Sequence, residues 1–279
     1  MSLTRKLVAA DDSLRQRLRP FLHSKFEELH DVVGQNEEAD SLIPPIVYQT
    51  LESRLLDSRH KRHAEQFRSL NSALTFTLFD SVQRDEYMRA NWGGEDIFGV
   101  YQQTLFPVMK ADVFRYCVVY DKGGYYVDAT KGIFRDLRSF HAKTDSGLIS
   151  FEKNVSPVPP NLVSGKNLLL PEFFVANWAF GFSRHHKILE SMIENILVYS
   201  SLFQKKIYEH PKTAILSLSA TGMFTKTVRD YVEDFGAEDL AQAGTDFDGT
   251  GLFRLRGANN PWPPVPHHYS EAKNSPILN

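Results

Sequence analysis

Short apolar runs alternate along the chain with stretches in which apolar residues recur at helical spacing. The runs have the length of buried strands, and the periodic stretches are typical of amphipathic helices. In chain order they predict a strand over 43–50, a helix over 58–70, a strand over 74–80, a helix over 81–91, and a helical segment that contains Phe98, Tyr101 and Leu105. Because strands that alternate with helices build parallel sheets, this order indicates a doubly wound, Rossmann-like α/β core with a mostly parallel sheet flanked by helices.

The stretch from Lys110 to Thr130 has the most unusual pattern. Its first part, as far as Lys122, is too apolar for a solvated helix, so we expect a mostly buried one. Within it, Asp112 and Arg115 lie three residues apart and therefore on one face. Charged groups on a buried helix are costly unless they meet each other or a polar ligand, so the pair is either a structural ion pair or the wall of a site.

Gly123 and Gly124 are expected to end this helix, because glycine adopts a positive φ without penalty. A short strand follows, in which Tyr126 and Asp128 share a face. Its carboxyl end presents Asp128 at the place where open α/β sheets usually bind ligands. Asp128 is therefore a candidate site residue, with a plain strand-end cap as the alternative.

Further elements are predicted downstream. They are a strand over 147–151, a long connection over 152–170, a strand-like run over 173–182 that Asn177 interrupts, a helix that begins at His185-His186, a helix from about Met223 to Phe235, an acidic turn over 246–251 and a short strand over 252–255. Long connections inside a compact domain are often functional. Thr221-Gly222, just before the second helix, is a weak signal for an anion site.

The N-terminal segment has a pattern of its own. From Ser2 to about Val33, leucines and phenylalanines recur at helical spacing among mixed charges, and polar residues 34–42 follow. We therefore expect a helical extension over 1–38 and a main domain over 43–279. The extension either packs on the domain or on a second copy of the chain, giving a homo-oligomer, or docks on a membrane surface; its mixed rather than basic polar face favours packing.

Composition narrows the class of protein. With 279 residues, 42% of them apolar, the chain can bury a sizeable core. A formal net charge of −2 gives no general attraction to nucleic acid or anionic lipid, so we expect no nucleic-acid partner. No run approaches the length of a membrane span, which fits a cytoplasmic protein, at most peripheral to a membrane. The only cysteine, Cys117, lies among apolar residues and is expected to be an inert core thiol.

Common signatures of cofactor and metal chemistry are missing from the sequence. It contains no GxxxxGK[ST] loop, no GxGxxG fingerprint and no GxSxG elbow. The histidine pairs at 185–186 and 267–268 are adjacent in sequence, so the two rings of a pair would not ordinarily face one metal ion. The remaining concentration of unusual residues is Asp112, Arg115, Tyr126 and Asp128.

Four segments, IPPIVYQT, LTFTLFD, ADVFRY and GGYYVDAT, resemble in order and spacing the DXD-motif sugar-binding region of glycosyltransferases that include yeast α-mannosyltransferases and capsular polysaccharide synthesis proteins. The resemblance covers about residues 43 to 140. It implies a GT-A fold and a hexosyltransferase that moves a sugar from a nucleoside diphosphate sugar, with UDP or GDP, to a glycan or lipid-linked glycan acceptor. It also implies retention of configuration and a place in surface polysaccharide or glycoconjugate synthesis.

The resemblance assigns roles by position. The donor pocket would be lined by Gln49, Thr50, Asp112, Arg115, Gly124, Tyr126 and Asp128. Asp128 matches the first acid of the motif, which contacts the ribose or donor sugar and the metal shell. Asp128 and Asn177 are the catalytic candidates, although Asn177 suits equally well a role in satisfying buried backbone groups.

The motif also implies a divalent cation, Mn²⁺ or Mg²⁺, that neutralises the leaving diphosphate. Thr130 stands where the second acid, the direct metal ligand, is usually Asp, and a hydroxyl is a neutral and weaker ligand. The metal set would therefore be Asp128, Thr130 and His268, with His267 as an alternative to His268; both histidines equally suit the surface of a proline-rich tail. The runner-up function is a degenerate member that binds a nucleotide sugar or glycan without turnover.

Overall fold

The computed structural model describes residues 26–35, 40–157, 167–251 and 271–279. The strands are β1 (Phe26–Glu28), β2 (Ile46–Thr50), β3 (Leu55–Asp57), β4 (Thr75–Phe79), β5 (Gly124–Val127), β6 (Gly147–Val155), β7 (Phe173–Val175), β8 (Ala179–Phe182) and β9 (Leu240–Thr245). The helices are α3 (Ser58–Leu70), α4 (Ser81–Trp92), α5 (Asp96–Gln103), α6 (Pro107–Lys122), α7 (Lys187–Ser200), α8 (Pro211–Leu218) and α9 (Thr221–Phe235), with a 3₁₀ turn η1 (Leu137–Phe140).

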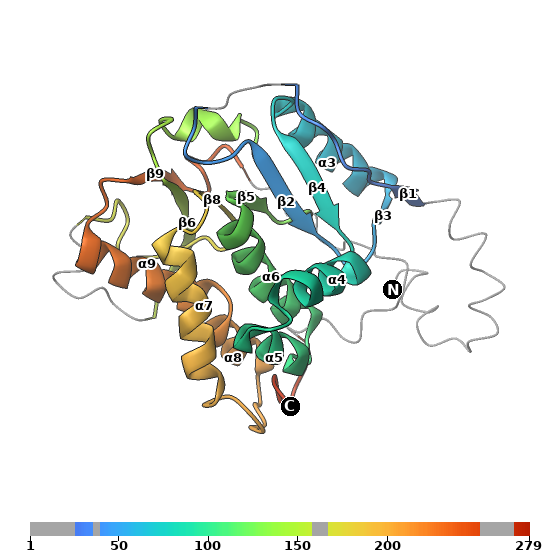
Figure 1. Ribbon diagram of the computed structural model, residues 1–279, viewed down its shortest axis with the longest axis vertical. Coiled ribbons are helices and arrows are strands. Elements are labelled where there is room, and N and C mark those ends of the chain that lie inside the picture. Colours follow the sequence, from blue (N-terminus) through green and yellow to red (C-terminus); the bar gives the residue numbers. More distant parts are fainter. Residues whose placement is uncertain (1–25, 36–39, 158–166, 252–270) are drawn as a thin grey trace.

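Within these ranges a seven-stranded sheet runs through the protein in the order β4-β2-β5-β8-β6-β7, with β9 on the other edge of β6 (Figure 1). β2 is parallel to β4 and β5, and β9 is parallel to β6. Only β7 and β8 run against their neighbours. The expectation of a mixed α/β fold with a mostly parallel sheet and flanking helices is therefore confirmed.

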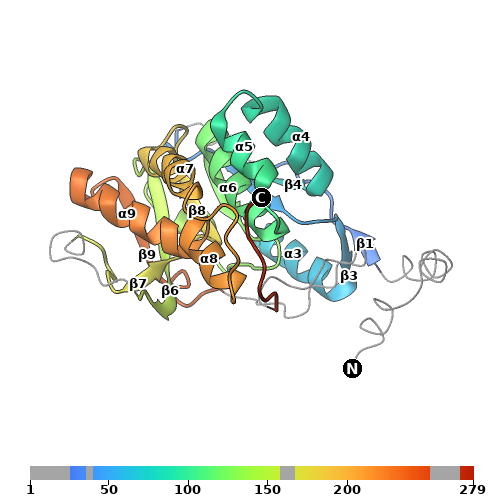
Figure 2. The ribbon, with the colours of Figure 1, turned by 90° about the horizontal axis from the view of Figure 1, so that it is seen from below.

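Successive residues of the central strands face two different layers. Val47 and Val127 pack with Phe67 of α3 and Leu137 of η1 on one face. On the other face, Tyr48, Tyr126, Ile149 and Phe151 join a larger core that contains apolar side chains from α4 to α9. Figure 2 shows α5 and α7 on one side of the sheet and α3 on the other. Because side chains alternate between the two faces of a strand, every second side chain of β5 points towards α6.

The connection between α6 and β5 has the predicted form. α6 starts at Pro107, three residues before the predicted start, since proline at the first helical turn loses no intrahelical hydrogen bond. Gly123 ends the helix with φ of 67°, and its N–H donates to the carbonyl of Val119 at 2.7 Å. Gly124 has φ of 107°, and a Cβ there would lie 2.6 Å from the carbonyl oxygen of Ile46. Only glycine fits this position without displacing β2.

The prediction of helix up to Val33 is wrong in its described part. Residues Phe26–Glu28 form β1, which pairs antiparallel with β3. Leu29 is buried after it, and Val32 bridges to Phe76 of β4. Pairing with neighbouring strands has thus overridden a local helical spacing. The predicted helix over 1–25 lies outside the described residues, as does the predicted strand over 252–255.

Some helices and strands differ from the predicted elements in other ways. α8 and β9 have no predicted counterpart. The sequence suggests Ser81 as the cap of α4, but Asp80 caps it: the Asp80 carboxylate accepts from the N–H of Gln83, whose side chain accepts from the N–H of Asp80. This reciprocal capping box satisfies two backbone donors, which one serine hydroxyl does not.

Two expectations from composition concern the helices. Cys117 is fully buried in α6, and burial raises the pKa of its thiol well above the ordinary value, so its place in the core is confirmed. Among the helices of the described ranges, none combines the length and the apolar character needed to cross a bilayer.

Candidate functional site

Asp128 lies directly after β5, at the carboxyl edge of the parallel strands. Its N–H donates to the carbonyl of Trp178 at 2.8 Å, and its carbonyl accepts from the N–H of Lys131 at 2.9 Å. The second bond closes the turn that contains Thr130. The backbone of Asp128 is therefore held from two sides, while its side chain keeps 26% of its surface exposed.

Three donors surround the Asp128 carboxylate. Arg115 Nη2 lies 3.3 Å from Oδ1, and the hydroxyl of Tyr126 donates to the same oxygen at 3.1 Å. Lys131 Nζ lies 3.7 Å from Oδ2. One negative charge thus has two cationic neighbours within 4 Å, a strong electrostatic restraint on its position.

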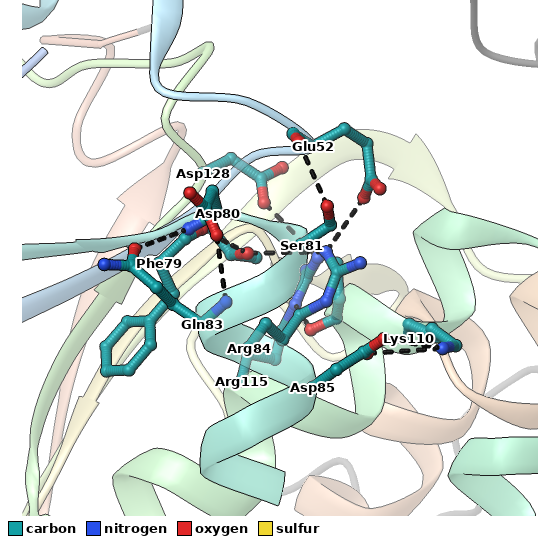
Figure 3. Close-up of polar contacts among 12 residues, drawn as sticks. Glu52, Phe79, Asp80, Ser81, Gln83, Arg84, Asp85, Lys110, Arg115 and Asp128 are labelled. Atoms are coloured by element: carbon teal, nitrogen blue, oxygen red, sulfur yellow. Dashed lines mark hydrogen bonds and ion pairs between the residues drawn. The ribbon is translucent and has the colours of Figure 1, made fainter. Parts of the chain in front are cut away.

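Arg115 connects Asp128 to the interior. Its side chain is 5% exposed, and its Nη2 lies 3.1 Å from Oδ1 of Asp112. Nη1 donates to the carbonyl of Asn177 at 2.7 Å, and the guanidinium carbon lies 4.6 Å from the centroid of the Tyr126 ring. The predicted pair of Asp112 and Arg115 therefore exists and extends to Asp128; Figure 3 shows the contact between Arg115 and Asp128.

Asp112 has a full set of partners. It accepts from the hydroxyl of Ser219 at 2.9 Å and from the amide of Asn177 at 3.5 Å, besides facing Arg115. Asn177 also donates to the hydroxyl of Tyr116 at 3.3 Å. Burial raises the pKa of Asp112 to about 7, and the positive charge of Arg115 limits that rise. The side chains of Asp112, Arg115, Tyr126, Asp128, Asn177 and Ser219 are called the Arg115 cluster below.

A second set of contacts joins the carboxyl ends of β2 and β4 to α4 (Figure 3). Arg84 is buried, and its Nη1 lies 2.9 Å from Oε1 of Glu52 and 3.4 Å from the hydroxyl of Thr50. Thr50 in turn donates to the carbonyl of Phe79 at 2.8 Å, and Ser81 donates to that of Glu52 at 3.2 Å. The hydroxyl of Thr50 therefore serves to tie strands together.

The structure brings only part of the predicted pocket together. Gln49 is buried; its oxygen accepts from Arg68 at 2.9 Å and its amide donates to the carbonyl of Val127 at 3.4 Å. Gly124 lies at the amino end of β5, the opposite end from Asp128. His267 and His268 lie outside the described residues. Asp112, Arg115, Tyr126, Asp128 and Asn177 do form one connected group.

A cleft of about 520 Å³ lies where β6 and β9 end, and it is connected to Asp128 through Lys131, which lines the cleft and has its Nζ 3.7 Å from the Asp128 carboxylate. Lys131 and Trp178 line it, and Nζ of Lys131 lies 4.4 Å from the centroid of the indole. Lys153 lines it from β6, with its Nζ 3.4 Å from Oδ2 of Asp246. The cleft therefore has an aromatic wall, two ammonium groups and the carboxylates of Glu152 and Asp246.

The described residues around Asp128 do not by themselves make up a site for the implied metal, and the expected ligand His268 lies outside the described residues. Mn²⁺ and Mg²⁺ take several oxygen or nitrogen ligands. In the described part of the chain, no group of three or more His, Cys, Asp or Glu side chains is placed to hold a metal ion. The Asp128 carboxylate faces Arg115 and Lys131 instead, and Thr130 offers only a hydroxyl.

Sequence reasoning missed Lys131 and Ser219. Lys131 directly follows the DAT segment, so a basic residue next to the incomplete acidic motif was the available signal. Ser219 lies 107 residues from its partner Asp112, after a helix that no pattern predicted. No local feature of the sequence indicates that contact.

Comparisons with known proteins give distant relationships. No protein-family model matches the chain. It is 19% identical over 235 residues to the Initiation-specific alpha-1,6-mannosyltransferase of Schizosaccharomyces pombe; the match covers 76% of this chain and 58% of that protein. Among solved structures it is similar to the PaToxG Glycosyltransferase, with 11% identity, a TM-score of 0.49, and coverage of 84% of this chain and 80% of that one. The sequence relationship is thus to a glycosyltransferase, at the level of distant similarity.

Proposed function

We propose that this protein is a glycosyltransferase of GT-A type that transfers a hexose from a UDP- or GDP-sugar to a hydroxyl of a glycan or lipid-linked glycan. The observation that carries the proposal is the partly exposed Asp128 carboxylate, held by Arg115 at the carboxyl end of a central parallel strand, with its neighbour Lys131 lining a cleft of about 520 Å³. The similarity to the alpha-1,6-mannosyltransferase supports the same reaction class. The segments around Asp128 resemble the DXD-motif region of glycosyltransferases, which supports the same reaction.

The reaction exchanges one bond for another. The acceptor oxygen bonds to the anomeric carbon of the donor sugar, and the bond from that carbon to the diphosphate oxygen breaks with its electron pair on the diphosphate. The acceptor proton passes to the departing diphosphate and through it to solvent. We propose retention of configuration, in keeping with the resembled family.

Within this reaction the two ends of the Arg115 cluster have different tasks. Asp128 has exposed surface, so its carboxylate contacts a hydroxyl of the donor. Asp112 and Arg115 are 2% and 5% exposed, which makes them positioning residues that keep Asp128 in one orientation. Catalytic groups held by buried neighbours lose little orientational freedom on binding, and this preorganisation favours catalysis.

A donor panel tests the proposal. The purified protein is incubated with UDP- and GDP-sugars and with glycan acceptors, with and without Mn²⁺, and release of the nucleoside diphosphate is followed. Turnover with at least one donor is expected, and Asp128→Asn should lower it by about 100-fold or more, as for loss of a charged contact made in the transition state. Asp230→Asn is the matched control, because Asp230 is exposed on α9 and pairs only with Lys226 among the described contacts.

Binding without turnover is the second candidate. The neutral Thr130 at the place of the second acid favours it. Donor binding without release across the whole panel, with acceptors present, would support the binding protein and contradict the enzyme.

A further inference from the structure

The end of α7 and the loop that follows it expose large aliphatic side chains close together. Val198 is 69% exposed, Leu202 is 55% exposed and Ile207 is 72% exposed. The N–H of Leu202 donates to the carbonyl of Tyr199 at 3.0 Å, so the helical turn continues past the end of α7 and carries Val198 and Leu202 on one face. Clustered apolar side chains of this kind, unlike single ones, mark interaction surfaces.

Residues 201–210, called the α7–α8 loop below, are held in place from the inside. The rings of Phe203 and Tyr208 stack with their centroids 6.0 Å apart. Tyr208 and Ser275 also exchange backbone hydrogen bonds, each of 3.2 Å. Because Phe203 and Tyr208 face inward, the side chains next to them in sequence, Leu202 and Ile207, lie on the outside of the loop. A loop restrained in this way loses little entropy when it binds.

The charges around this apolar patch are mostly positive. Three exposed lysines lie in the loop and in the first turn of α8, and none of them has an ion pair among the described contacts: Lys205, Lys206 and Lys212. Glu209 is the one acidic residue over 201–212, so three lysines and one glutamate give this stretch a net charge of +2. The neighbouring segment 271–275 adds one acidic and one basic residue, which cancel. An apolar patch edged by lysines is complementary to an anionic lipid surface.

The α7–α8 loop lies on the same edge of the molecule as Asp128. α7 starts near the end of α6, where the carbonyl of Tyr120 accepts an N–H from the turn before α7 at 2.8 Å. At the other end of α7, the amide of Gln204 donates at 2.8 Å to Gln103, four residues before α6 starts. α7 therefore runs antiparallel to α6, and the loop reaches the amino end of α6, whose Arg115 contacts Asp128. In Figure 1 the loop forms the lower tip of the molecule, next to α8.

We propose that the α7–α8 loop docks on a membrane surface that contains anionic lipid, with Leu202 and Ile207 inserted between the lipid head groups. A second protein is a poorer occupant, because three protruding side chains do not supply the roughly 800 Å² per partner that a stable interface buries. A bilayer accepts a small convex apolar tip, and lysines beside the tip add electrostatic attraction. Docking brings a lipid-linked acceptor to the edge that holds Asp128, and this last step alone rests on the proposed function.

Sedimentation with lipid vesicles tests the docking. The full chain is mixed with vesicles of phosphatidylcholine, with or without phosphatidylglycerol, at low and at high salt. We expect it to sediment with the anionic vesicles at low salt and much less in the other conditions, because salt screens the lysines. Leu202→Ser/Ile207→Ser should weaken partitioning into anionic vesicles by about tenfold or more, through the lost apolar contact. Lys205→Gln/Lys206→Gln should weaken it by about tenfold or more at low salt and little at high salt.

Matched controls change the same kinds of side chain elsewhere. Phe235→Ser removes an exposed apolar side chain at the end of α9. Lys122→Gln/Lys187→Gln removes two exposed lysines where α6 ends and α7 starts, at the opposite end of both helices from the loop. Both controls should bind vesicles like the wild type. Circular dichroism checks that every variant is folded.

The outcomes separate docking from catalysis. Failure to sediment with anionic vesicles, or equal partitioning of the wild type and both loop variants, overturns the proposal. A dimer in light scattering that Leu202→Ser/Ile207→Ser converts to a monomer assigns the surface to a second copy of the chain and overturns it as well. Transfer to a soluble glycan should be the same in the loop variants and the wild type. Absence of all transfer refutes the transferase proposal, whereas the docking is judged by sedimentation alone.

Discussion

Replacing Arg115 by methionine tests how strongly the folded protein depends on the charge of Arg115. The substitution keeps the length and the apolar stem of the side chain but removes its charge. It leaves Asp112 buried without its cation, takes one partner from Asp128, and leaves the carbonyl of Asn177 without a donor at 2.7 Å. Breaking a buried ion pair from one side destabilises proteins by about 3 to 5 kcal/mol, and we expect that range here.

The loss of stability in Arg115→Met should become larger as pH rises, because the buried Asp112 then ionises without its cation. Its folded pKa, about 7, is above the unfolded value of 3.8, so the folded state binds more protons and loses stability as pH rises towards 7. Without Arg115 the folded pKa rises further. Between about pH 6 and pH 8 the variant should therefore lose up to about 1.4 kcal/mol more than the wild type, because its Asp112 stays protonated over about one further pH unit while the wild-type carboxyl ionises near pH 7.

Urea unfolding at about pH 6 and pH 8 measures both effects, with the slope of the transition checked for two-state behaviour. The double variant Asp112→Asn/Arg115→Met is the control, because it removes the carboxylate whose charge carries the pH dependence. A single variant that is destabilised equally at both pH values would refute the reasoning. So would a double variant that keeps the excess loss at the higher pH.

Other predictions follow from the same contacts. In Asp112→Asn alone, the fall in unfolding free energy between about pH 4 and pH 7 should be smaller than in the wild type, because the folded-state pKa of Asp112 is raised to about 7; an equal fall in urea titrations contradicts this. Gly124→Ala should destabilise by at least about 1 to 3 kcal/mol, since φ is 107° and the new Cβ would meet the Ile46 carbonyl, whereas Gly99→Ala in the open part of α5 should be neutral or stabilising. Cys117 should react with a thiol reagent only in denaturant, because it is fully buried; rapid labelling of the native protein would contradict its position in the core.

Local patterns predicted the parts of the fold whose periodicity is strong. The helix over 58–70 has the predicted bounds. α6 starts earlier than predicted, at Pro107, and the strand predicted over 125–128 is β5 at Gly124–Val127, so Asp128 directly follows the strand. β9 was missed because its sequence, LAQAGT, has few β-branched or aromatic residues; it is a strand because it pairs with β6. β1 is likewise a strand through its partner β3.

In the candidate site, contacts between residues close in sequence could likewise be predicted, whereas contacts between distant segments could not. Asp112 and Arg115 are three residues apart, so their proximity follows from helix geometry, and Asp128 follows from the strand that comes next. Ser219 and Asn177 reach the same cluster from segments 107 and 65 residues away. Their presence depends on how helices and strands pack, which periodicity does not encode.

The energetics of the cluster favour a positioning role over a stabilising one. Replacing a buried ion pair with apolar residues of similar size is often neutral or stabilising, so stability alone gives little reason for Asp112 and Arg115 to lie inside the core. Their arrangement does something that apolar residues cannot do: it holds Asp128 at the surface of the sheet through directional contacts at 3.1 and 3.3 Å. If that is their purpose, Asp112→Asn/Arg115→Met should be clearly less destabilised at about pH 8 than Arg115→Met and yet lose most donor turnover, since no uncompensated buried charge remains but Asp128 is no longer oriented. A double variant that keeps full turnover would contradict the positioning role.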